Sequence, residues 1–238
     1  MTDRRTVAFL ALGICLACGL IIASYLIGNA LVEFKSAERY VTVKGLSERI
    51  VEADLAIWSI SFRNSANDLE ELQRSIDDNK TKLYNFLLEA GFPESEISSM
   101  PPQITDTQAL PYYDAGKGRE YRYVAVTRVT LRSGDVANVK KAMEKAGQLV
   151  SAGIAIGEDS SAQFAFTKLN DIKPEMIAEA TKNAREAAEQ FARDSGSKVG
   201  AIRRATQGYF TVENRDAGSP DFKMVRVVTT VDFFLTSH

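Results

Sequence analysis

The feature that most constrains this chain is an uncharged, apolar run over residues 7–32. As a helix, its roughly 26 residues would rise about 39 Å, more than the roughly 30 Å hydrocarbon core of a bilayer. Arg4 and Arg5 precede the run, and residues 33–39 carry no net charge. The run therefore predicts a transmembrane anchor, with residues 1–6 in the cytoplasm and the rest of the chain outside.

A cleaved signal peptide is the alternative interpretation of this run. Its apolar core normally spans about 7–15 residues and ends at an A-x-A-like site. The run is longer, and the tripeptides at 23–25 and 29–31 match such a site poorly. An uncleaved anchor is favoured, and both interpretations deliver the remaining chain to the same side of the membrane.

Composition narrows the function classes of the remaining chain. Cys15 and Cys18 lie inside the apolar run, and we interpret them as ordinary membrane-helix residues because thiolate chemistry needs water. The single histidine, His238, is terminal, which excludes a Cys/His zinc site and disfavours a histidine-activated nucleophile. A net charge of −2 argues against nucleic acid as a partner. No cofactor is expected.

Beyond a neck at 33–39, the chain alternates between strand and helix patterns. Strands are predicted at 40–43 and 50–62, separated by a turn at Gly45. A capped helix begins at Asn67 and ends at Gly91. Further elements follow in order: a strand at 97–107 interrupted by two prolines, a strand at 121–132, a connecting helix at about 135–147, a strand at 162–169, a long helix ending at Gly196, and strands at 199–212 and 222–235.

Two stretches, 50–132 and 162–235, share the order strand, long helix, glycine, strand, strand. Corresponding landmarks, such as Gly91 and Gly196, are separated by about 105 residues. The sequence therefore predicts an α+β fold with two duplicated β-α-β-β units. Each unit would be a mixed sheet with one helix-covered face and a right-handed, parallel crossover.

Three groups of residues resemble the SIMPL-domain family of bacterial envelope proteins. The first runs from Val43-Lys44-Gly45 to Ala53-Asp54-Leu55-Ala56, with Ala53 where the family usually has proline. The second is Tyr123-Val124-Ala125. The third is an alanine ladder that ends at Gly196 and consists of Ala180, Ala184-Arg185, Ala187-Ala188 and Ala192. The motif residues carried over as structural are Gly45, Asp54, Tyr123, Ala125, Ala184, Arg185 and Gly196.

This resemblance implies a periplasmic domain at 40–238, held at the bacterial inner membrane by the bilayer anchor at 7–32. It also implies a tendency toward homo-oligomers and a loose association with envelope stress. The family has no agreed enzymatic activity, so it implies no catalytic residues. The leading hypothesis is a non-enzymatic, self-associating envelope protein. A periplasmic small-ligand or peptide-binding module is the alternative, with its ligand unknown, and a hydrolase or metal-dependent enzyme is less favoured.

Some polar and aromatic residues are candidates for surface functions. Tyr112 and Tyr113, on a loop at 110–120, are expected either to contact a partner or to pack on the protein's own surface. Arg122, Arg128 and Arg132 share a strand face, where a solvated surface is favoured over an anion-binding patch.

The acidic residues give weaker signals. Asp54 is expected to be a hydrogen-bonded structural carboxylate rather than a catalytic one. Four further acidic residues lie in or near predicted loops but lack the alternating spacing that wraps a cation: Asp106, Asp114, Glu158 and Asp159.

Overall fold

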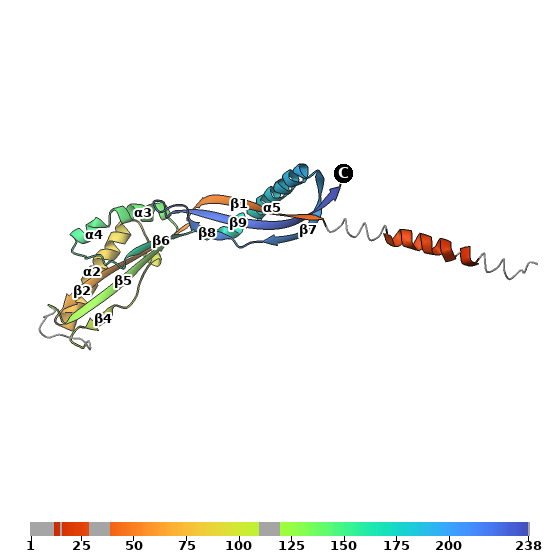
Figure 1. Cartoon of the computed structure of the whole chain (residues 1–238). Coiled ribbons are helices and arrows are strands. Elements are labelled where there is room, and N and C mark those ends of the chain that lie inside the picture. The colour runs from red at the N-terminus through yellow and green to blue at the C-terminus, as the bar shows by residue number, and fades with distance from the viewer. Residues whose placement is uncertain (1–11, 15, 29–38, 110–119, 238) are drawn as a thin grey trace, which may run out of the picture. The chain divides into compact units, whose positions relative to one another are not determined.

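The structure is a computed structural model that describes residues 12–14, 16–28, 39–109 and 120–237 (Figure 1). The chain divides into two compact units, each built from segments that are distant in sequence. Unit 1 comprises Met1–Glu48, Ile172–Thr211 and Arg226–His238. Unit 2 comprises Arg49–Asp171 and Val212–Val225.

Unit 2 contains an antiparallel five-stranded sheet of order β3-β5-β2-β6, with β4 also paired to β5. Pro101 and Pro102 separate β3 from β4, as the sequence predicts, because proline removes a ladder donor. The strand bounds are β2 Leu55–Ala66, β3 Ile97–Ser99, β4 Gln103–Asp106, β5 Tyr123–Ser133 and β6 Ser161–Ala165.

Helices cover one face of this sheet. They are α2 (Leu69–Glu89), α3 (Val136–Glu144) and α4 (Gly147–Ser151), with a short 3-10 helix, η1 (Glu94–Glu96), after α2. The main core cluster joins strand residues to helix residues that include Trp58, Ile60, Phe62, Leu83, Leu87, Val129, Leu131, Val139 and Leu149. Alternation along β2 and β5 puts most of their apolar residues on this covered face.

The ends of α2 show one correct prediction and one error. Gly91 follows the helix with φ +94°, a conformation that glycine adopts without strain. The N-cap is Asp68 rather than Asn67, because the Asp68 carboxylate accepts from the backbone N–H groups of Glu70 and Glu71. The Asn67 side chain instead accepts from the backbone N–H of Arg122.

The second sheet has four strands, of order β1-β9-β7 with β8 paired to β9, and most of its residues belong to unit 1. The elements are β1 (Tyr40–Glu52), α5 (Leu169–Asp194), β7 (Ser197–Gln207), β8 (Thr211–Asn214) and β9 (Phe222–Ser237). Every fourth residue of α5 is buried: Met176, Ala180, Ala184, Ala188 and Ala192. The pairing of β7 with β9 is antiparallel and shifts register on both sides of Ile202.

Several sequence predictions about topology were wrong. β1 is one continuous strand, so there is no turn at Gly45. The predicted strand at 162–169 is β6, which pairs with β2 in unit 2 rather than opening a second unit. The crossover strands are not parallel neighbours, because β5 lies between β2 and β3. The predicted connecting helix is confirmed as α3, but the sequence did not indicate the short helix α4 that follows it.

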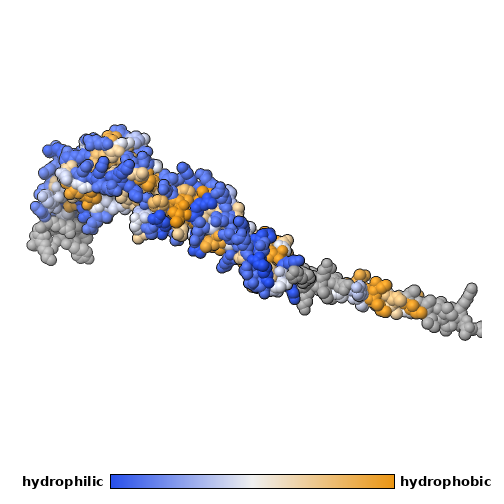
Figure 2. Space-filling view, turned by 90° about the horizontal axis from the view of Figure 1, so that it is seen from above, coloured by the Kyte–Doolittle hydropathy of each residue, from blue (hydrophilic) through white to orange (hydrophobic). Residues whose placement is uncertain are grey.

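The described residues 12–14 and 16–28 of the N-terminal segment are helical, and Figure 2 shows their surface as largely hydrophobic. Within the described part of the chain, no helix is both long and apolar enough to cross a membrane. The rest of the predicted anchor, including Cys15, and the neck up to residue 38 lie outside the described residues.

Candidate functional site

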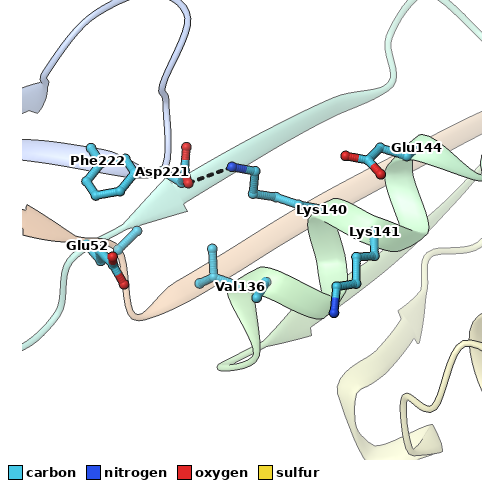
Figure 3. Close-up of a pocket in the computed structure, with 9 residues that line it drawn as sticks. Glu52, Val136, Lys140, Lys141, Glu144, Asp221 and Phe222 are labelled. Atoms are coloured by element: carbon cyan, nitrogen blue, oxygen red, sulfur yellow. Dashed lines mark hydrogen bonds and ion pairs between the residues drawn. The ribbon is translucent and has the colours of Figure 1, made fainter.

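A pocket of about 350 Å³ lies beside α3 in unit 2 (Figure 3). Helix α3 begins where the Asp135 side chain accepts from the backbone N–H of Asn138, as predicted. The backbone N–H of Ala53 donates to the carbonyl oxygen of Asp221 at 2.7 Å. Proline, which the resemblance leads one to expect at position 53, has no such donor. The pocket is lined by Glu52, Ala53, Val136, Ala137, Lys140, Lys141, Glu144, Asp221 and Phe222.

An ion pair crosses this pocket (Figure 3). The Nζ atom of Lys140 donates to the Asp221 carboxylate at 2.7 Å, and the Asp221 side chain is only 14% exposed. The hydrogen bond from Lys140 lowers the pKa of Asp221, although burial of the carboxylate opposes this shift. Asp221 is therefore held ionised, which suits it to structural pairing rather than to proton transfer.

We expect this ion pair to make the free energy of unfolding depend on pH in the acidic range. Because folding lowers the pKa of Asp221, its contribution is complete above its unfolded pKa of about 3.9 and disappears as pH falls through the folded pKa. Lys140→Ala should lower the free energy of unfolding at neutral pH by up to about 1 kcal/mol and flatten its acid dependence. Urea denaturation across the acidic range measures both, and Lys141→Ala is the matched control. Equal acid dependence in Lys140→Ala and the parent protein would contradict this assignment.

Lys223 is the second residue of β9, which forms a hairpin with β8. It is 8% exposed and donates a hydrogen bond from Nζ to Asn214 Oδ1. Burial lowers the pKa of Lys223, while the Asp221 charge opposes the shift. Its amine is thus engaged in holding the hairpin rather than aimed at the pocket.

The family-motif residues of unit 1 meet where β1 packs against α5, a contact we call the Gly45 seam and define by Gly45, Ala180 and Ala184. A Cβ atom at position 45 would lie 2.5 Å from the backbone nitrogen of Ala184 and closer still to the carbonyl oxygen of Ala180. Only glycine allows the helix and strand backbones to approach this closely. The alanine ladder is therefore buried against the sheet of its own unit.

Polar contacts fix the helix along the Gly45 seam. Ser47 Oγ donates to Glu179 at 2.8 Å, and the Asn183 side chain donates to the carbonyl oxygen of Leu46 at 2.7 Å. The guanidinium of Arg185 lies 5.0 Å from the centre of the Phe233 ring, a cation–π contact. Gly196 ends α5 with φ +66°, as predicted. These motif residues thus have structural environments in unit 1.

The family-motif residues of unit 2 are also structural. The carboxylate of Asp54 accepts from the backbone N–H of Thr167 at 2.7 Å and from its hydroxyl at 3.1 Å, consistent with the expected structural role. Ala125 is fully buried under α2, in a cluster with Leu72 and Ile76, and Tyr123 packs against this cluster.

The arginines expected to share a strand face divide into two groups. Arg122 precedes β5 and forms an ion pair with Asp106 at 3.0 Å. Arg128 and Arg132 lie exposed on the uncovered face of the sheet. The register of β2 against β5 places Arg63, which the sequence analysis did not single out, on that same face. We call this surface the arginine face and define it by Arg63, Arg128 and Arg132.

Other candidates fall outside these contacts. Tyr112, Tyr113 and Asp114 lie outside the described residues. Glu158 and Asp159 join no cluster, and no three His, Cys, Asp or Glu side chains of the described ranges gather as metal ligands.

The comparisons with known proteins agree with the motif assignment. No curated protein sequence matches the chain. The profile of the family described as SIMPL, protein of unknown function (DUF541), matches residues 41–232. This match extends from β1 to β9 and includes all the motif residues named above. The chain therefore belongs to the SIMPL family.

Proposed function

We propose that this chain is a non-enzymatic, membrane-anchored protein of the bacterial periplasm that self-associates through the free edge of β1. The uncharged run at 7–32 and the preceding arginines support the anchor and its orientation. The single observation that carries self-association is the long edge that β1 leaves unpaired among the described strands.

The free edge of β1 presents backbone groups of even-numbered residues. Leu235 N donates to Arg39 O, so odd-numbered residues turn their backbone groups toward β9 and even-numbered residues turn theirs away. The bond from Asn183 to the carbonyl oxygen of Leu46 fits this assignment, and that oxygen can accept a second hydrogen bond from a partner strand. The edge is 13 residues long and contains no proline, two features that favour pairing with another strand.

The side chains of β1 are self-complementary in an antiparallel pair centred on Leu46. In that register, Lys44 of each copy lies opposite Glu48 of the other copy, and Leu46 faces its own counterpart. Lys44 has no ion pair within the described residues, and Glu48 forms an ion pair with Arg226 at 3.4 Å. A parallel, in-register pair would instead place Lys44 beside Lys44. The antiparallel register is therefore favoured.

Cysteine cross-linking tests this register. In a full chain with Cys15 and Cys18 replaced by alanine, Leu46→Cys should form a disulfide-linked dimer in isolated membranes under mild oxidation. Paired residues in such a ladder have Cα atoms about 5.5 Å apart, within disulfide range. Thr42→Cys should not cross-link alone, but should do so when combined with Ile50→Cys, because the register places these positions opposite each other.

Ile202→Cys on β7 is the matched control, because Ile202 is also exposed on an edge strand. Cross-linking of Ile202→Cys as readily as Leu46→Cys would indicate random collision. A Leu46→Cys chain that remains monomeric would contradict pairing through β1, and recovery of the parent chain in the soluble fraction would contradict the anchor.

We also propose that the two sheets derive from a duplication. The two sheets share a strand order. In the first, β5 lies between β2 and β3, the strand that follows α2. In the second, β9 lies between β1 and β7, the strand that follows α5. Thr127 and Thr229 lie midway along β5 and β9, both buried, and neither hydroxyl has a hydrogen-bond partner among the described residues. These correspondences support a duplication in which β1, α5, β7 and β9 form the second repeat. Its first strand would then be β1 rather than residues 162–169.

A further inference from the structure

The arginine face presents three guanidinium groups that form no ion pair with a described residue. Arg63, Arg128 and Arg132 are exposed, and none of their side chains has a hydrogen bond or ring contact with a described residue. The neighbouring strand positions on this face that the registers assign are apolar, hydroxyl or amide residues. The nearby described carboxylates are Glu120, which lines a pocket with Arg63, and Glu96, which directly precedes β3. The chain as a whole has a net charge of −2, so this face is a local concentration of positive charge.

The spacing of the three guanidinium groups follows from the strand register. Arg63 pairs with Val126, so it is the diagonal neighbour of Arg128 on the adjacent strand, at about 7 Å between Cα atoms. Arg132 lies about 13 Å further along β5. Like charges this close repel each other, and an external anion would relieve the repulsion because guanidinium binds carboxylates in paired hydrogen bonds.

The apolar residues beside the arginines indicate what kind of anion fits. Val126 lies opposite Arg63, and Ile57 lies opposite Arg132, and both apolar side chains are only half-buried. An inorganic anion or a phosphate polymer would leave these side chains in water. An extended polypeptide presents every second side chain to one face, so acidic and apolar residues that alternate on that face would match this surface.

We propose that the arginine face binds an extended, acidic polypeptide segment of another protein. Acidic residues at every fourth position of the segment would repeat at about 13 Å, the separation between Arg128 and Arg132. Apolar residues midway between the acidic ones would lie level with Val126 on one side of Arg128 and level with Thr130, diagonal to Ile57, on the other side. Binding is expected to weaken with added salt, because the arginine face is open to solvent.

A labelled synthetic peptide tests the proposal directly. Repeats of Glu-Ser-Val-Ser place glutamate and valine alternately on one face of an extended chain, and Gln-Ser-Val-Ser is the neutral control peptide. Fluorescence anisotropy with the full chain should show saturable binding of the acidic peptide only. The double variant Arg63→Glu/Arg128→Glu should raise its Kd at least about tenfold.

Arg74→Glu supplies the matched protein control. Arg74 lies on α2, where its side chain is 72% exposed, and its charge reversal alters the net charge without touching the arginine face. Equal loss of binding in Arg74→Glu and Arg63→Glu would overturn the proposal in favour of general electrostatics. Equal binding of the neutral peptide would also overturn it, as would tighter arginine-dependent binding of polyphosphate or anionic lipid vesicles.

Discussion

Gly45→Ala is expected to destabilise unit 1 by about 3 kcal/mol. The added methyl group would overlap the backbone of α5 at Ala180 and Ala184, and backbone atoms cannot turn aside as a flexible side chain can. Relieving the overlap means moving the helix off β1, which strains the bonds from Ser47 to Glu179 and from Asn183 to Leu46. The loss of helical signal during urea denaturation, followed by circular dichroism, measures the effect.

The control for this substitution is Gly147→Ala. Gly147 begins α4, and a Cβ atom there would have no neighbour within 4 Å. We expect its stability to stay the same or to rise by up to about 1 kcal/mol, because alanine is the better helix former. Similar effects of the two substitutions would contradict the packing that defines the Gly45 seam.

Phe62→Ala is expected to destabilise unit 2 by about 3–5 kcal/mol. Phe62 is fully buried and belongs to the core cluster that includes Ile60 and Trp58. Truncation removes the transfer free energy of the ring and leaves a cavity that the surrounding sheet and helices fill only in part. Trp58 is the only tryptophan of the chain, so its fluorescence during urea denaturation reports on this core directly.

Tyr209→Ala is the aromatic control for this prediction. Tyr209 is 97% exposed, so its truncation should alter the free energy of unfolding by less than about 0.5 kcal/mol. If Phe62→Ala unfolded at the same urea concentration as Tyr209→Ala, the core of unit 2 would have to be assigned elsewhere.

The sequence predicts the elements whose signals are local. The alternation of β5, the breaks at Pro101 and Pro102, and the glycines that end α2 and α5 each depend on neighbouring residues. These features follow from the side-chain period of a strand and from the backbone freedom of glycine. The family also follows from the order of such motifs along the chain.

The remaining features depend on contacts between distant residues, which a single sequence does not reveal. In the sequence Gly45 resembles a turn glycine. It is needed because α5, which lies more than a hundred residues later in the sequence, packs closely against β1 at this position. Arg63 joins the arginine face only through the register of β2 on β5. In the same way, the sequence of β6 alone does not reveal that this strand pairs with β2.

The two register shifts around Ile202 have a consequence for the size of any assembly built through β1. Two chains joined there would share one broad sheet whose outermost strand on each side is a bulged, arginine-bearing β7. Bulges twist a strand away from further partners, and charged side chains on an edge strand disfavour its pairing with another exposed edge. Sheet extension would thus terminate at a closed pair instead of continuing into a fibril, and a larger complex would need a different surface.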